Sequence, residues 1–471
     1  PIPRRQRQMC IRDRFKTACS RGTQSRMSTE YLSHEQDADG VTTTLLDRLS
    51  GREFQVQSKY LIGADGGNSL VAEHIDTPVE GQMGVGGSMN ILFKADLSKY
   101  VAHRPSVLYW VMQPGADVGG IGMGLVRMIR PWNEWLIVWG YDINEPAPEV
   151  TPEFATGVAR QLVGDPELEI ELLSANTWTV NDAYATSLQK GRVFIMGDAA
   201  HRHPPSNGLG SNTSIQDSFN LAWKLTAVLK GQAGQALLDT YSDERAPIAK
   251  QIVTRANQSI GEFGPIFQAL GMTGGTDIEL IKQNMDARCD AGPDAEAQRA
   301  ALRDAIEFKK YEFDAHGVEM NQRYRSTAVV TDGQMEPAFD LDAELHFQPT
   351  TWPGARLPHT WIFRESNGDK VSTLDLCGHG QFTLFTGIGG EAWREAATQV
   401  GADFGMAINV HVIGPRQEYV DHVGDWARAN EVSDTGCILV RPDHHVAWRA
   451  DELSEDPKSE LARVMNTILA R

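Results

Sequence analysis

The residues best placed to do chemistry lie in one stretch, Gly191 to Leu225, which reads GRVFIMGDAAHRHPPSNGLGSNTSIQDSFNLAWKL. Its first part, Val193 to Met196, is a short apolar run that predicts a strand, and Gly197 and Asp198 follow at its end. Because glycine has no Cβ, a ligand can approach the backbone there. A short carboxylate beside it can accept hydrogen bonds from the hydroxyl groups of a ribose or a polyol. The pair therefore predicts a site for a ligand that carries hydroxyl groups.

The loop that follows predicts a second set of contacts. Pro204 and Pro205 stiffen this loop, and Gly208 and Gly210 permit dihedral angles that bring successive backbone N–H groups together. We expect a helix to begin near Asn212, and a helix N-terminus offers free donors and partial positive charge to an anionic atom. Each feature alone fits an ordinary strand–loop–helix connection. Their combination in one short stretch favours a ligand site.

An α/β framework is expected to hold these loops. Val41 to Asp65 has the alternation of strands and ends in the cluster GADGG, as a strand of an α/β sheet does when it delivers a loop to a ligand. Residues 81–182 are rich in β-forming residues and predict a mixed sheet with one face packed and one face open to a ligand. From Ile215 to about Gln258 helical periodicity dominates. One stripe of this helical region is apolar: Ile215, Phe219, Ala222, Leu225 and Leu229.

The second half of the chain predicts a helical region, a linker and a small separate domain. Helical sequence between Ala295 and Tyr324 is followed by a proline-punctuated stretch, which places a boundary near Pro349 to Pro358. Beyond it strand-like and helix-like segments alternate, which indicates a small α/β domain. A G-x-G-x-x-A pattern at Gly387 to Ala392 is interpreted as a tight turn of that domain, because no acidic residue ends the next strand.

The stretch around Asp198 resembles the second flavin motif of the class A FAD-dependent aromatic hydroxylases, and within them the phenol hydroxylase group. The resemblance implies that Gly197 and Asp198 hold the ribityl chain of FAD, and that Pro204 and Pro205 border the isoalloxazine ring. It further implies that a set of residues at the helix start faces the pyrimidine edge of the ring: Gly208, Leu209, Gly210, Ser211 and Asn212. Preorganised N–H donors there would stabilise negative charge on the reduced ring.

A second stretch, YLIGADGGNSLV from Tyr60 to Val71, is similar to the family's Asp-Gly motif. The resemblance implies that Asp65 and Gly66 contact both FAD and the pyridine nucleotide, NADPH or NADH. The family often has an arginine just after this motif, where this chain has Ala72. By itself, GADGG would indicate no more than a turn.

A third match places Tyr184 shortly before the strand that leads to Asp198. The phenol hydroxylases have a tyrosine here that hydrogen-bonds the phenol of the substrate, so the resemblance implies that Tyr184 is catalytic. The alternative is a half-buried structural tyrosine.

The likeness runs from about Arg21 to the end of the chain and is greatest to the 2,4-dichlorophenol 6-monooxygenases. It implies a mixed α/β (α+β) fold in which a partial, Rossmann-like FAD-binding domain carries an inserted β-sheet substrate domain. A helical segment and a thioredoxin-like C-terminal domain follow. The expected ranges are 17–80 and 183–255 for the FAD-binding domain, 81–182 for the substrate-binding sheet, 256–345 for the helical region and linker, and 346–471 for the thioredoxin-like domain.

The arginine-rich residues 1–16 include QMCIRDR, which looks like the translation of a sequencing-library end, so we interpret them as a non-native leader. The family opens with a strand–GxGxxG–helix unit that cradles the FAD pyrophosphate, and no such motif lies before Asp65. We therefore interpret the chain as truncated at its N-terminus. On that interpretation it would bind FAD weakly or not at all and could lack activity by itself.

The implied reaction is the hydroxylation of a phenol or chlorophenol ortho to its hydroxyl group, which gives a catechol and uses FAD, NADPH or NADH, and O2. Two alternatives remain open at this point. One is a hydroxylase of aromatic polyketides, which shares the flavin motifs. The other is a truncated, non-catalytic remnant.

Composition excludes several other classes of protein. The 44 basic and 62 acidic side chains give a formal net charge of −18, which disfavours nucleic-acid binding. No apolar run approaches the roughly 20 residues of a membrane helix, and five scattered cysteines without a CxxC indicate a reducing compartment, the cytoplasm. His201 and His203 lack a third ligand, so no metal is expected, whereas His444 and His445 are expected to be solvated. We also expect a homo-oligomer.

Overall fold

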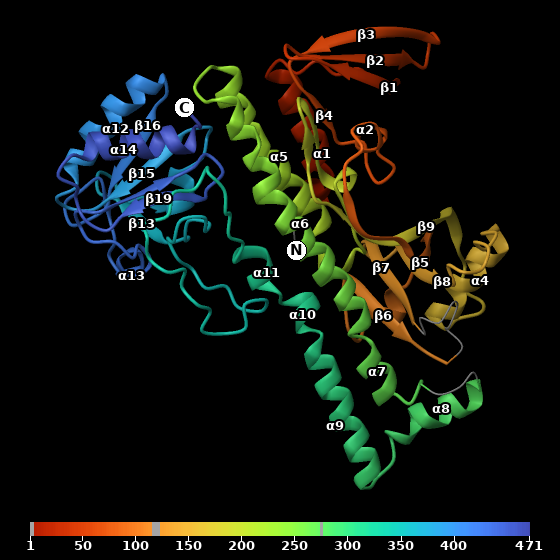
Figure 1. The fold of residues 1–471 in the computed structure, drawn as a ribbon. Helices are drawn as coiled ribbons and strands as arrows, with labels where there is room; N and C mark the ends of the chain where they lie inside the picture. The colour runs from red at the N-terminus through yellow and green to blue at the C-terminus, as the bar shows by residue number, and fades with distance from the viewer. Residues whose placement is uncertain (1–3, 115–122, 274–276) are drawn as a thin grey trace.

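The computed structural model describes residues 4–114, 123–273 and 277–471, with residues 4–10 by their backbone alone. It is a mixed α/β structure, as the resemblance implies. Figure 1 shows two long central helices with strands of the N-terminal half on one side and the C-terminal domain on the other. The central helices are α5 (Gly210–Leu229) and α6 (Thr240–Gly261).

Two small sheets begin the chain and bring two predicted site loops to one edge. The strands β1, β2 and β3 form an antiparallel sheet after the first helix. In the next sheet β11 pairs in parallel with β4, with Ile195 opposite Gly63, and antiparallel with β10. The parallel pairing places the ends of β4 and β11 together, and Asp65 and Asp198 lie just beyond these ends. The bounds are α1 (Arg4–Ser20), β1 (Thr29–Gln36), β2 (Val41–Asp47), β3 (Arg52–Ser58), β4 (Leu61–Gly63), α2 (Leu70–His74), β10 (Gln189–Lys190) and β11 (Val193–Ile195).

A six-stranded sheet in the order β12-β9-β5-β8-β7-β6 forms the next layer. Every pair in it is antiparallel, so the prediction of a mixed sheet is wrong. Strands joined by turns run back beside their predecessors, which produces antiparallel neighbours. The predicted packed face is present, because α4 covers one face with Ala155, Val158 and Leu162 against Trp135 and Ile137. The bounds are β5 (Val79–Lys94), α3 (Ser98–Val101), β6 (Leu108–Met112), β7 (Met123–Arg130), β8 (Glu134–Tyr141), α4 (Pro152–Val163), β9 (Glu171–Ala185) and β12 (His201–Arg202).

The apolar stripe of α5 is not its buried face. Ile215, Phe219 and Leu229 are 41%, 45% and 59% exposed, whereas Leu225 is buried. The opposite face is buried although it carries charge, because each of its charged groups meets an opposite charge. Its polar members are Thr213, Asp217, Asn220 and Lys224.

Helices α7 to α11 follow α6 in the stretch expected to be helical, and the boundary expected between residues 255 and 256 falls inside α6. Lys309 of this region is buried, and its Nζ lies 2.6 Å from the carbonyl oxygen of Ser259 on α6. After the last of these helices the chain crosses to the C-terminal domain without a regular helix or strand between residues 321 and 360, all of which the structure describes. The bounds are α7 (Gly264–Ala269), α8 (Ile278–Ala287), α9 (Pro293–Phe308), α10 (Lys310–Phe313) and α11 (His316–Met320).

The C-terminal domain has the connectivity expected of a thioredoxin-like fold. Its main sheet has the order β16-β15-β18-β19, in which only the β15–β16 pair is parallel. Two helices, α12 and α14, pack on it through Trp393, Val400, Leu461 and Met465. The bounds are β13 (Trp361–Arg364), β14 (Lys370–Ser372), β15 (Phe382–Thr386), α12 (Glu391–Phe404), β16 (Ile408–Val412), β17 (Tyr419–Val420), α13 (Asp425–Ala429), β18 (Cys437–Val440), β19 (Val446–Ala450) and α14 (Pro457–Ile468).

Two details of this domain concern reactive side chains. Cys377 is a free thiol whose burial raises its pKa to about 12, so it is a poor nucleophile at neutral pH.

His445 is buried, and its ring stacks on Tyr324 with 4.0 Å between centroids. His444 is half-buried and lies edge-on to Phe219 of α5. The expectation of solvated histidines is therefore wrong, because their turn packs against the neighbouring domain.

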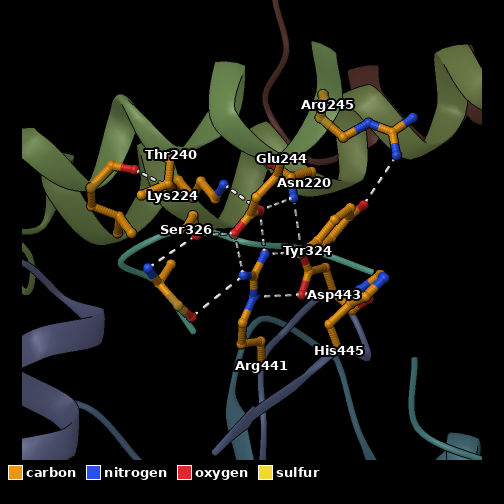
Figure 2. A network of polar contacts seen from close by, with 12 residues as sticks. Asn220, Lys224, Thr240, Glu244, Arg245, Tyr324, Ser326, Arg441, Asp443 and His445 are labelled. Atoms are coloured by element: carbon orange, nitrogen blue, oxygen red, sulfur yellow. Dashed lines mark hydrogen bonds and ion pairs between the residues drawn. The ribbon is translucent and has the colours of Figure 1, made fainter. Parts of the chain in front are cut away.

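A buried ion cluster, shown in Figure 2, joins α5 and α6 to the C-terminal domain. Glu244 accepts hydrogen bonds from both terminal nitrogens of Arg441, at 2.6 and 2.8 Å. Lys224 Nζ lies 2.7 Å from the same carboxylate, and Asn220 bridges Glu244 to Asp443. All five side chains are buried. The removal of any one charge would leave its buried partners with less opposite charge to compensate them.

Candidate active site

Two predicted site loops meet at Arg202. The Met196 N–H donates to the carbonyl of Gly63 at 3.0 Å, which continues the β4–β11 pairing into the loops. Burial lowers the pKa of Arg202, while the charges of Asp198 and Asp65 act in the opposite direction. The Arg202 guanidinium thus lies close enough to both carboxylates to interact with them electrostatically. The structure therefore brings the two motifs together at Arg202.

The Gly197–Asp198 turn presents an exposed carboxylate. Gly197 has a φ of +61°, and a Cβ there would lie 3.0 Å from Oγ of Ser214 on α5. Asp198 is exposed, and within the described ranges no hydrogen-bond donor contacts its carboxylate. An exposed carboxylate at the end of a buried strand is free to bind the hydroxyl groups of a ligand.

A buried carboxylate that the sequence analysis missed supports this turn from behind. Asp217 Oδ2 accepts the Gly197 N–H at 3.0 Å and lies 2.8 Å from Nε2 of His201, while Oδ1 accepts from Nε of Arg245 at 2.8 Å. Burial opposes its ionisation, but Arg245 and His201 lower the pKa of Asp217 to about 2. The helical spacing of Asp217, Asn220 and Lys224 along α5 was the signal that could have revealed this polar face.

The proline loop is anchored to the helical region. The carbonyl of Pro204 lies 2.7 Å from Nδ1 of His203. Asn207, with a φ of +62°, donates from Nδ2 to the carbonyl of Tyr311 and accepts from Oγ of Ser259, at 2.7 and 2.8 Å. Pro205 and Gly208 remain exposed at the loop surface. The loop therefore has a fixed shape and an open outer side.

The first turn of α5 offers an array of backbone donors. The helix begins at Gly210, close to the predicted start, and its first backbone acceptor is the carbonyl of Leu209, which binds the Thr213 N–H at 2.8 Å. Among the residues that the structure describes, no side chain caps this end, and the first turn contains no acidic residue. The N–H groups of Gly210, Ser211 and Asn212 therefore lack intrahelical partners. Leu209 is buried and holds the helix start against α6.

Asp65 and Gly66 form a tight turn at the start of α2. Gly66 has a φ of +84°, which favours glycine. The Asp65 carboxylate accepts from Oγ of Ser69 at 2.6 Å and from the Val71 N–H at 3.2 Å, so it stabilises the N-terminus of this short helix. Asp65 is nevertheless exposed. Its predicted contact with FAD and the pyridine nucleotide stays a prediction.

Tyr184 lies on β9 opposite His201 of β12, next to the loop that carries Asp198. It is 8% exposed, and its hydroxyl donates to the carboxylate of Glu80. This hydrogen bond raises the pKa of Tyr184. Lys250 Nζ lies 3.5 Å from the same carboxylate. Sequence reasoning missed Glu80 and Lys250, because both are distant from Tyr184 along the chain.

Two further predictions concern metals and membranes. In the described ranges, no three histidine, cysteine, aspartate or glutamate side chains are grouped so that they could hold a metal ion. None of the helices described in the structure combines the length and apolarity needed to cross a bilayer.

The geometry fits a flavin, and comparisons with known proteins point to the same group. Residues 8–256 match the family described as an FAD binding domain, and residues 350–471 match the aromatic-ring hydroxylase C-terminal domain. The chain is 57% identical to 2,4-dichlorophenol 6-monooxygenase of Cupriavidus pinatubonensis, over 97% of this chain and 76% of that protein. It is 51% identical to phenol 2-monooxygenase of a Pseudomonas species, over 96% of this chain and 72% of that protein.

A solved structure agrees with these matches. The flavin-dependent monooxygenase PieE, in complex with FAD and substrate, superposes with a TM-score of 0.86 and 42% sequence identity. The match covers 94% of this chain and 75% of that one. The chain belongs to the FAD-dependent aromatic-ring hydroxylases.

Proposed function

We propose that this chain hydroxylates a phenol or chlorophenol ortho to its hydroxyl group and yields a catechol, with FAD as cofactor and NADPH or NADH and O2 as co-substrates. The observation that carries the proposal is the free carboxylate of Asp198 beside the uncapped first turn of α5. The Asp198 carboxylate can accept hydrogen bonds from the hydroxyls of a ribityl chain. The free N–H groups of the first turn of α5 can donate to the electron-rich edge of a flavin ring. The high identity to the dichlorophenol enzyme supports the choice of substrate.

When bound, FAD would supply the redox chemistry by which one oxygen atom of O2 enters the aromatic ring and the other leaves as water, with NADPH or NADH as the reductant. The chain's own residues would bind and orient the reactants. Asp198 would hold ribityl hydroxyls, and the N–H groups of Gly210, Ser211 and Asn212 would stabilise negative charge on the pyrimidine edge. The exposed face of the loop at Pro205 would border the ring.

Tyr184 and Glu80 would act on the substrate hydroxyl. The Tyr184 hydroxyl donates to Glu80, so a lone pair of its oxygen remains able to accept the O–H of a phenol. A phenol that gives up part of its proton in this way has a more electron-rich ring. Glu80 and Lys250 would then hold Tyr184 in place, because Glu80 accepts its hydrogen bond and Lys250 pairs with Glu80 and lies over the Tyr184 ring.

We also infer that the protein acts in the cytoplasm and as a homo-oligomer. Four cysteines of the described chain are free thiols, as expected in a reducing compartment: Cys19, Cys289, Cys377 and Cys437. The oligomer remains an expectation, and light scattering of the purified protein would test it.

The test of the reaction is product analysis under labelled oxygen. Purified protein is incubated with FAD, NADPH, ¹⁸O2 and either 2,4-dichlorophenol or a polycyclic aromatic quinone. We expect a dichlorocatechol that contains one ¹⁸O atom. Preferential oxidation of the quinone would favour the polyketide alternative. The absence of labelled product from either ring would contradict the proposal.

A further inference from the structure

One oxygen of Asp217 contacts both ends of the turn that carries Asp198. Oδ2 accepts the Gly197 N–H at 3.0 Å, and the same atom lies 2.8 Å from Nε2 of His201. Between these two anchor points only Asp198, Ala199 and Ala200 intervene. The carboxylate therefore spans the base of the turn, and Asp198 stands at the exposed side.

The position of Asp217 is itself fixed by an arginine with several partners. Arg245 binds Oδ1 through Nε at 2.8 Å, the hydroxyl of Tyr324 through Nη1 at 3.1 Å and the carbonyl of Thr213 through Nη2 at 3.3 Å. Figure 2 shows Tyr324 between Arg245 and the ion cluster around Glu244. Asp217 is 1% exposed and Arg245 is fully buried. An ion pair held in this way has little freedom to move.

Conformation explains why the turn needs such support. Gly197 has a φ in the left-handed region, and glycine is the residue that leaves the backbone freest to move between conformations. A backbone with this freedom would present Asp198 in many directions. The hydrogen bond from the Gly197 N–H to a buried charge favours one of them, because bonds to charged groups are the stronger ones.

We propose that Asp217 is a positioning residue, which clamps Gly197 and His201 and thereby sets the direction in which Asp198 points. This inference rests on the proposed function, because Asp198 matters only if it holds the flavin. Asp217 has no contact with the reactants in this account. It acts through the backbone of the turn.

The test separates the shape of the turn from flavin binding. Three variants are compared with the unchanged protein: Asp217→Asn, His201→Phe and the control Glu244→Gln. His201→Phe removes one end of the clamp and leaves the buried Asp217 paired with Arg245, so it serves if Asp217→Asn does not fold. Glu244 is the neighbour of Arg245 on α6 and belongs to the other ion cluster, so its variant loses stability without touching the turn.

Hydrogen–deuterium exchange of the peptide covering residues 195–203 is measured first, and FAD affinity is then measured by flavin fluorescence. In the two clamp variants only, we expect exchange of this peptide to be faster by about tenfold, because one charge-assisted hydrogen bond is lost. We expect the FAD affinity of the same two variants to fall in parallel. Unchanged exchange in the folded clamp variants would overturn the inference. Faster exchange with unchanged FAD affinity would support the clamp and count against the flavin role of Asp198.

Discussion

At the scale of single residues, the site depends on which polar groups are free and which are held. Asp198 is exposed and unpaired within the described chain, so it can serve a ligand. Asp217 is buried, and both of its carboxylate oxygens accept hydrogen bonds from the protein, so its role is structural. Two carboxylates on the same strand–loop–helix unit thus have different roles because of their surroundings.

Substitution of Asp198 tests its role as a ligand group. Asp198→Ala should weaken FAD binding by about tenfold or more, because one hydrogen bond to a charged group is lost. Fluorescence titration of the folded protein with FAD measures this. Asp403→Ala, an exposed acidic residue on α12, is the matched control and should leave the affinity unchanged. Equal affinities for the two variants would remove Asp198 from the site.

Substitution of Gly197 tests the fit of the turn against α5. Gly197→Ala introduces a Cβ at 3.0 Å from Ser214 Oγ in a backbone with positive φ. Gly231, at the end of α5, has a φ of +69° and open space around it. Gly231→Ala should therefore cost only the conformational strain of about 1–2 kcal/mol, and Gly197→Ala should cost more. Urea unfolding of both variants measures the difference, and an equal loss would show that the turn has room.

The residue types at the site were predictable from the sequence, but their partners were not. Local sequence rules predict a loop and a helix start from Gly197, Asp198 and the glycines at the start of α5. The Asp217–Arg245 and Tyr184–Glu80 contacts join residues 28 and 104 positions apart, which no local rule reaches. For the same reason the sequence predicted Tyr184 but not the carboxylate that accepts its hydrogen bond.

At the scale of elements, the parallel β4–β11 pair and α5 position the site. The pair brings the Asp65 and Asp198 loops to one edge, and α5 brings its free N–H groups to the same loop. The strands and helices themselves were predicted from alternation and periodicity. The buried face of α5 was not, because its polar residues are buried through ion pairs rather than through hydrophobicity.

Removal of the charge of Glu244 tests the contact between α6 and the C-terminal domain. Glu244→Gln leaves the buried Lys224 without its ion-pair partner and leaves Arg441 with Asp443 alone, which should lower the free energy of unfolding by about 3–5 kcal/mol. Urea denaturation followed by tryptophan fluorescence measures it. Glu171→Gln breaks the exposed pair with Lys94 and should have little effect. A Glu244 variant as stable as the Glu171 variant would contradict the importance of the cluster.

At the scale of the whole molecule, buried carboxylates join the domains and make the fold sensitive to acid. Burial raises the pKa of Glu244 and of Asp443, but Arg441 outweighs this effect and leaves both values below the ordinary range. The pKa of Asp217 is likewise lowered, to about 2. These groups stay ionised in the folded chain at a pH where the unfolded chain has taken up protons.

The sign of the pH dependence follows from these shifts. A lowered pKa in the folded state stabilises the protein above the ordinary carboxyl pKa, and this contribution is lost as the pH falls toward the folded value. The free energy of unfolding should therefore fall steeply between about pH 4.5 and about pH 2. Urea denaturation across this range measures it. A free energy that stays constant there would show that these carboxylates do not couple to folding.

The central claim is that FAD binds between the Gly197–Asp198 turn and the first turn of α5. A density map of the protein with FAD, by crystallography or electron microscopy, tests it most directly. We predict density for the ribityl chain at the Asp198 carboxylate and for the pyrimidine edge at the N–H groups of Gly210, Ser211 and Asn212. Flavin density at any other place on the chain would contradict it.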